Sequence, residues 1–125
     1  GERTQPEVAM SFISEIALNQ QIVESLRHNS QVKRYRTYSW QRNKDKLDFL
    51  GLELQNTLAK AFGMAEEFNR EIDAARKYKS SSYLVGIPAN KLREPFAKGR
   101  QGLEEWFQSN SGQAQVAPRR SGLFS

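Results

Sequence analysis

Residues 47–75 read LDFLGLELQNTLAKAFGMAEEFNREIDAA. When Gly51 is counted as one of the positions, small or apolar residues recur at alternating steps of four and three, at Leu47, Leu54, Leu58, Ala61, Ala65, Phe68, Ile72 and Ala75. Such steps keep side chains on one face of an α-helix, and their sustained alternation is the heptad pattern of a coiled coil. A polar row at the same spacing lies away from this stripe, at Glu53, Asn56, Lys60, Glu67, Arg70 and Lys77. The pattern predicts a long amphipathic helix.

We expect this helix to run from about residue 40 to residue 79. Its end follows from Lys79 and serines 80–82, because lysine suits the negative end of the helix dipole and serine side chains compete for backbone hydrogen bonds. At about 1.5 Å per residue the helix would be roughly 60 Å long. The sequence therefore predicts an elongated molecule.

A second amphipathic stretch occupies about residues 5–30. Thr4 precedes Glu7 by three residues, the spacing of a capping box, and Pro6 is tolerated in a first helical turn. Asn19 lies in the apolar stripe, and two interpretations are open: it fixes register or oligomeric state, or it lies at a solvated end of the interface. The stripe itself recurs three and four residues apart, at Ala9, Phe12, Ile16, Val23 and Leu26.

The simplest arrangement of the helices at residues 5–30 and 40–79 is an antiparallel hairpin, with its turn in the polar segment between them. A third, shorter helix is expected at about residues 90–108, although Gly99 and Gly102 weaken it. It would cover part of the hairpin with Leu92, Phe96, Leu103, Trp106 and Phe107.

The predicted fold class is thus all-α, a long antiparallel helical hairpin with a shorter third helix packed back on it. Residues 1–108 form one helical domain, and residues 109–125, rich in Gly, Ser and Gln, form a polar tail. Because apolar residues widen the stripes beyond a coiled-coil seam, we expect further packing from a second copy of the chain, as a homodimer. The widening residues are Ile13, Ile22, Phe49, Leu52, Phe62 and Met64.

The 125 residues include no cysteine and a single histidine, which excludes a disulfide framework, thiolate chemistry and Cys-based metal sites. Glu67 and Glu71 lie one helical turn apart, but surface ion pairs such as Asp73 with Lys77 account for the acidic residues better. His28 is expected near a helix C-terminus, where a cation is favoured. We therefore predict no enzymatic activity and no catalytic residue, cofactor, metal or small-molecule substrate.

Positive charge gathers between Arg27 and Lys46, where seven lysines and arginines accompany one aspartate, a net charge of +6 in a chain of +5. Tyr35, Tyr38 and Trp40 are interleaved with these cations. Such a composition suits nucleic acid, through phosphate neutralisation and base stacking. It equally suits an anionic membrane surface, or simply keeps a turn soluble. The candidate binding residues are Lys33, Arg34, Tyr35, Arg36, Tyr38, Trp40 and Arg42.

The order of these features is similar to that of a known class of domain. The features that carry this similarity are, in order, Glu15-x-x-x-Asn19, Leu26, the run Tyr35-Arg36-Thr37-Tyr38-x-Trp40, Phe62 and Glu67-Phe68-Asn69. Over residues 10–79 the chain resembles the membrane-proximal helical domains that follow an N-terminal transmembrane segment in many uncharacterised prokaryotic proteins. The resemblance implies an anchored scaffold without known catalytic residues, with the basic domain on the cytoplasmic side of the membrane.

The sequence as a whole predicts a non-enzymatic structural or protein-interaction domain, the soluble part of a membrane-anchored protein. Its expected partner is a protein, including a second copy of this chain, and an anionic membrane surface is a further candidate partner. The alternative function is nucleic-acid binding through the basic and aromatic segment 27–46.

Overall fold

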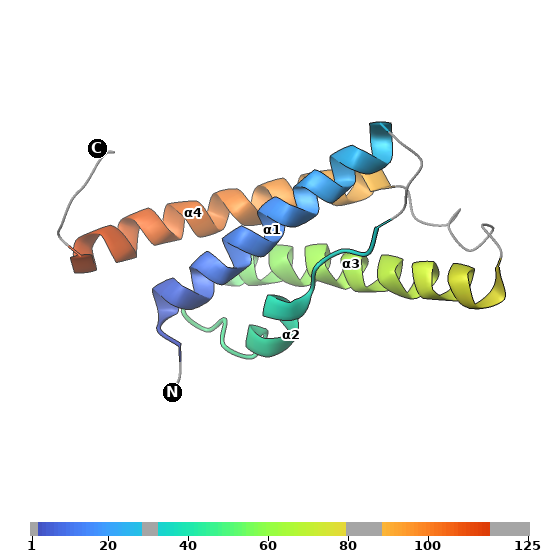
Figure 1. The fold of residues 1–125 in the computed structure, drawn as a ribbon. Helices are drawn as coiled ribbons and strands as arrows, with labels where there is room; N and C mark the ends of the chain where they lie inside the picture. Colours follow the sequence, from blue (N-terminus) through green and yellow to red (C-terminus); the bar gives the residue numbers. More distant parts are fainter. Residues whose placement is uncertain (1–2, 29–32, 80–88, 116–125) are drawn as a thin grey trace.

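A computed structural model describes residues 3–28, 33–79 and 89–115. Every regular element in these ranges is helical, which confirms the all-α class with long antiparallel helices (Figure 1). The elements are α1 (Gln5–His28), α2 (Tyr38–Asn43), α3 (Leu52–Tyr78), the 3-10 helix η2 (Ala89–Leu92) and α4 (Arg93–Gln115).

Helix α4 lies against both α1 and α3 and runs antiparallel to each (Figure 1). Near the end of α1, Glu24 pairs with Arg93 at 3.1 Å and Gln20 accepts a 2.7 Å hydrogen bond from Arg100. The sequence predicted that α1 would form an antiparallel hairpin with the helix at residues 40–79. Instead, α1 packs mainly on α4, and α1 and α3 run in the same direction. The physical reason is that the chain after α1 does not turn at once: α2 lies beside α1, and α3 begins only after this return.

The single helix expected over residues 40–79 is two helices. Helix α2 ends at Asn43, and α3 begins after Gly51, whose extended backbone (φ −62°, ψ 153°) forms its N-cap. Leu47 and Leu50 of the connection are buried in the core. The apolar spacing of the residues before Gly51 therefore reflects their burial in the core, although these residues are not helical.

Two predicted helix limits are confirmed. The Thr4 N–H donates to the Glu7 carboxylate at 2.9 Å and the Glu7 N–H donates to the Thr4 hydroxyl at 3.3 Å, which completes the capping box of α1. Helix α3 ends at Tyr78, where Lys79 takes a left-handed conformation (φ 53°) and donates its N–H to the carbonyl of Ala75. Backbone groups at both ends are thereby satisfied.

Helix α4 is longer than the predicted third helix. It continues to Gln115, so residues 109–115 of the predicted polar tail are helical, and residues 116–125 lie outside the described ranges. Glycine has a packing role in this helix, because a Cβ atom on Gly99 would lie 3.0 Å from the Leu58 side chain. The missing side chain lets α4 approach α3 closely.

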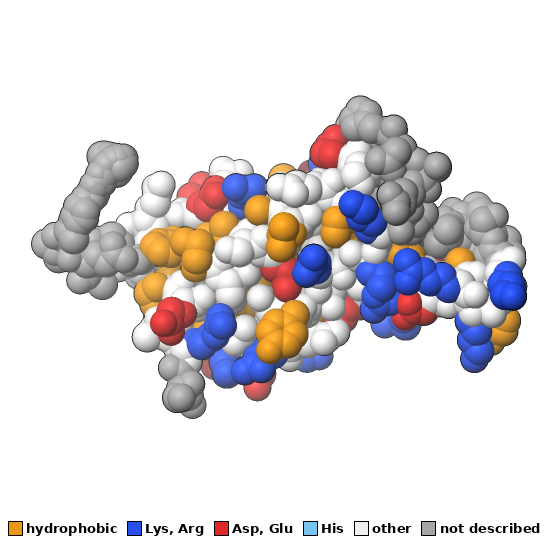
Figure 2. All heavy atoms as spheres, in the orientation of Figure 1, with side chains coloured by type: hydrophobic (Ala, Val, Ile, Leu, Met, Phe, Trp, Pro, Cys, Tyr) orange, Lys and Arg blue, Asp and Glu red, His pale blue; other side chains and the backbone are white. Residues whose placement is uncertain are grey.

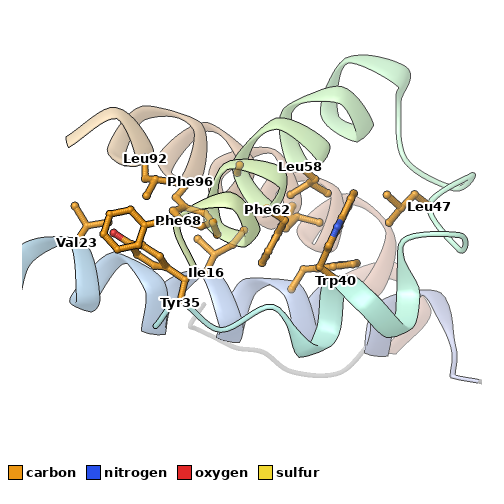
Figure 3. Packing of buried hydrophobic residues seen from close by; sticks show 14 of the residues in the cluster. Ile16, Val23, Tyr35, Trp40, Leu47, Leu58, Phe62, Phe68, Leu92 and Phe96 are labelled. Atoms are coloured by element: carbon orange, nitrogen blue, oxygen red, sulfur yellow. The ribbon is translucent and has the colours of Figure 1, made fainter. Parts of the chain in front are cut away.

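The core is organised around aromatic rings from all four α-helices (Figure 3). Phe62 of α3 stacks on Trp40 of α2 with ring centres 5.5 Å apart. Its ring also lies edge-on to Phe96 of α4 at 5.5 Å and contacts Phe12 of α1 at 5.8 Å. Such ring pairs contribute about 0.5–1.5 kcal/mol each beyond the area that they bury, so Phe62 joins α2 and the three long helices.

Candidate interaction surface

The outward side of α1 is free of charge over most of its length. Between Val8 and Val23 the single ionisable residue is Glu15, and its side chain is only 8% exposed. Met10 and Leu18, in contrast, are 43% and 44% exposed. An outward helix side usually carries charged residues, so this uncharged side is unusual. We call it the α1 face; it consists of Met10, Ser14, Ala17, Leu18 and Gln21.

Glu15 is turned inward because it caps α2. Its carboxylate accepts hydrogen bonds from the backbone N–H of Ser39, at 2.9 and 3.1 Å, and from that of Trp40 at 3.4 Å. The first amides of a helix have no intrahelical acceptor, and a negative charge there also complements the helix dipole. The one charge in this part of α1 therefore holds α2 in place.

Residues 33–37, which we call the strap, are held between α1 and α3 by two buried asparagines. Asn19 of α1 accepts a 2.7 Å hydrogen bond from the N–H of Arg36 and donates one of 2.8 Å to its carbonyl. Asn69 of α3 does the same for Tyr35, at 2.8 and 3.0 Å. Buried backbone groups need such partners, so the two amides replace the hydrogen bonds that a helix or sheet would supply.

This geometry corrects both interpretations of Asn19. The side chain is fully buried, so it does not lie at a solvated end. Its donor and its acceptor are both used by Arg36 of the same chain, so it serves the strap and not a seam between helices.

Two of the seven predicted binding residues belong to the core. Tyr35 lies edge-on to Phe68 with ring centres 5.1 Å apart, and Trp40 stacks on Phe62. Both rings are buried, so the prediction that they face a ligand is wrong. Burial also raises the pKa of the Tyr35 phenol to about 12, and its hydroxyl finds no hydrogen-bond partner among the described residues.

Arg34 fastens the strap to α3. Its guanidinium forms an ion pair with Asp73 and also donates a 3.4 Å hydrogen bond to the carbonyl of Asn69. The sequence had suggested Lys77 as the partner of Asp73, so this ion pair joins two elements and is not confined to one helix.

The other four predicted residues are exposed. Arg42 lies over the ring of Tyr38, 5.3 Å from its centre, and donates a 2.8 Å hydrogen bond to its hydroxyl. Lys33 and Arg36 have no carboxylate partner within the part of the chain that the structure describes. These two cations are therefore available to a ligand.

A groove of about 400 Å³ separates the α1 face from the strap. One wall comes from α1 and is uncharged, and the other comes from the strap and is basic. In Figure 2 hydrophobic and basic side chains lie side by side on the face formed by α1, the strap and α2. The lining residues are Leu18, Gln21, Ile22, Ser25, Lys33, Arg34 and Arg36.

Within residues 3–28, 33–79 and 89–115, no three His, Asp or Glu side chains come together in a way that could hold a metal ion. No helix in the same ranges has the length and apolar character needed to cross a bilayer. Comparison with protein-family models, with curated proteins and with solved structures finds no match. The geometry places an uncharged side of α1 next to the exposed cations Lys33 and Arg36, an arrangement suited to recognition.

Sequence reasoning missed the inward roles of Glu15 and Asn69, although signals for both exist. Glu15 is the lone charge in an otherwise uncharged stretch of helix, which indicates an inward role. Asn69 lies seven residues after Phe62, so the two share a helix face, and both are buried. The strap itself has no local pattern, because its partners are supplied by distant helices.

Proposed function

We propose that this chain is a non-enzymatic protein-interaction domain that uses the α1 face and the neighbouring strap. One observation carries the proposal: α1 is uncharged on its outward side from Val8 to Val23 and exposes Met10 and Leu18 there. No charge has to leave water when a partner covers this side, so the desolvation cost is small. Burying the exposed parts of two large apolar side chains contributes about 1 kcal/mol each.

The fixed strap supports the same proposal. Asn69 and Asn19 bind the backbone of Tyr35 and Arg36, and Glu15 binds that of Ser39 and Trp40, so Arg36 beside the α1 face has an ordered main chain before any partner arrives. Binding then orders few additional groups, and less of the interaction energy is lost to entropy.

A second copy of the chain is the first partner to test. The α1 face has no charges that would repel each other across a two-fold axis, although the chain as a whole carries +5. Sedimentation over a range of concentrations should show a dimer, and Leu18→Glu should shift it to monomer. A chain that stays monomeric throughout points instead to a different protein as the partner.

Site-specific photo-crosslinking tests the proposal for any protein partner. A benzophenone amino acid is placed at Leu18, and a matched control carries it at Leu52, which is 71% exposed on α3. We expect cross-linked proteins in the producing cell from position 18 only. The purified partner should bind the chain, and Leu18→Glu should lower the affinity about tenfold. Equal cross-linking from both positions, or binding unaffected by Leu18→Glu, would contradict the proposal.

Nucleic-acid binding is the second candidate function, favoured by the exposed cations of segment 27–46. Burial of Tyr35 and Trp40 weakens its stacking component, because only Tyr38 of the three aromatic residues is exposed. A salt-titrated binding assay with DNA and RNA tests it. Affinity that falls steeply with salt and is lost when Arg34, Arg36 and Arg42 are replaced would favour this function.

A membrane location, as the soluble part of an anchored protein, is also proposed from the resemblance. The exposed cations would add about 1 kcal/mol each near anionic lipid. Co-sedimentation with vesicles that contain phosphatidylserine, compared with neutral vesicles, tests this contribution directly.

A further inference from the structure

The groove between α1 and the strap has two walls of different chemistry. The α1 wall presents Leu18 and Ile22 with two uncharged polar residues, and the strap wall presents Lys33, Arg34 and Arg36. A ligand that fills the groove must therefore place an apolar group on one side and an acidic group on the other. A purely anionic ligand would leave the apolar wall in water.

The positive charge of the strap wall is only partly compensated. Arg34 is paired with Asp73, whereas Lys33 and Arg36 meet no carboxylate within the described ranges. The main chain of Arg36 is fixed by both hydrogen bonds of Asn19. Arg36 therefore stands at a defined place on the groove wall, and exposed Lys33 lines the same wall, where carboxylates can reach both cations.

The recessed shape decides between classes of ligand. A bilayer surface is flat, and the apolar residues it would contact lie in the wall of a groove of about 400 Å³. A nucleic acid backbone would use the cations but not Leu18 and Ile22. The ridge of side chains on a helix or an extended peptide is convex and carries apolar and acidic groups at regular spacing.

We infer that this groove binds an acidic amphipathic segment of a partner protein. An apolar side chain of the segment packs on Leu18 and Ile22, and its carboxylates pair with Lys33 and Arg36. This inference rests on the proposed function as a protein-interaction domain and names the chemistry of the partner.

The test uses the full chain and a fluorescent synthetic peptide of about four helical turns, with leucine at helical spacing and glutamate between the leucines. Two control peptides replace all glutamates by glutamine or all leucines by serine. We expect the parent peptide to bind at least tenfold more tightly than either control, because both walls contribute. Shifts of the backbone NMR signals should map to residues 18–25 and 33–36.

A matched pair of charge reversals locates the cations. Lys33→Glu with Arg36→Glu should weaken peptide binding about tenfold, whereas Lys60→Glu with Arg70→Glu, on exposed positions of α3, changes the net charge equally and should leave it within about twofold. The backbone hydrogen bonds of Arg36 do not depend on its side chain, so the first variant keeps its fold.

Several outcomes would overturn the inference: no binding of the parent peptide, equal binding of the glutamine peptide, or equal loss in the two double variants. Binding of anionic vesicles or DNA, but not of the peptide, would overturn it in favour of those ligands. The photo-crosslinking partner separates this failure from that of the proposed function. A partner lost on Leu18→Glu but unaffected by the Lys33 and Arg36 reversals leaves the interaction domain intact and removes only the acidic-segment inference.

Discussion

Replacing Asn69 by alanine tests how the strap is held. The Asn69 amide accepts a 2.8 Å hydrogen bond from the Tyr35 N–H and donates a 3.0 Å bond to the Tyr35 carbonyl, both in buried surroundings. Alanine leaves both backbone groups without a partner. The bond from Arg34 to residue 69 goes to its backbone carbonyl and survives the change.

The expected loss follows from these two groups. A buried donor or acceptor left unpaired costs about 1–3 kcal/mol, and alanine regains about 0.6 kcal/mol of helix propensity over asparagine. The net loss for Asn69→Ala is therefore about 3 kcal/mol in the free energy of unfolding. Asn19→Ala should cost a similar amount, because the Asn19 side chain is fully buried and alanine leaves both backbone groups of Arg36 without this partner.

Urea unfolding followed by circular dichroism measures both values. Asn56→Ala, on the exposed side of the same helix, is the matched control and should stabilise the protein by about 0.5 kcal/mol. If Asn69→Ala lowers the free energy of unfolding by less than about 0.5 kcal/mol, the two hydrogen bonds do not hold the strap.

Three further predictions use the same assay. The raised pKa of Tyr35, about 12 against 10.0, means that the unfolded chain loses this proton first, so the free energy of unfolding falls by about 2 kcal/mol as pH rises from 10 to 12. Tyr35→Phe should remove this loss and should not destabilise the protein at pH 7; an unchanged pH profile would contradict the burial. Gly63→Ala, with no atom within 4 Å of the new Cβ, should stabilise by about 1 kcal/mol. Gly99→Ala, whose Cβ would lie 3.0 Å from buried Leu58, should destabilise by about 1 kcal/mol, and equal effects at both glycines would refute this packing. Glu15→Gln keeps one acceptor for Ser39 and should cost about 1 kcal/mol, whereas Glu15→Ala should cost about 2 kcal/mol; a smaller loss in the alanine variant would argue against the cap.

Patterns within one helix were predictable from the sequence. The capping box of Thr4 and Glu7 and the end of α3 at Tyr78 depend on neighbouring residues and on regular spacing. The stripe that includes Leu58 and Ile72 is buried as the heptad spacing indicates. Local physics is sufficient for such features.

Features that depend on distant residues were not predictable in the same way. The spacing continues through Gly51, but the helix does not, because Leu47 and Leu50 reach the core from a connection. Tyr35 and Trp40 lie among cations in the sequence, which suggests ligand binding, yet both rings are buried in the core. Their burial requires hydrogen-bond partners for the backbone nearby, and Glu15, Asn19 and Asn69 supply these from other helices.

The candidate surface shows the same division. Lys33 and Arg36 were identified by charge alone, and both are exposed on the wall of a groove. The opposite wall escaped prediction, because the sequence pattern places Ile22 only in a widening of the helix stripe and assigns no role to Leu18. Whether an apolar residue faces the core or a groove depends on which helices pack around it.

Hydrogen exchange at the amides of Tyr35, Arg36 and Ser39 tests the central claim most directly. Each of these N–H groups donates to a side chain of α1 or α3, so a strap and an α2 that are held by these side chains predict protection that approaches that of the α1 and α3 backbone. Exchange at the rate of an unstructured peptide, in a protein whose long helices remain protected, would show that the strap is loose and that the groove beside it has no fixed wall.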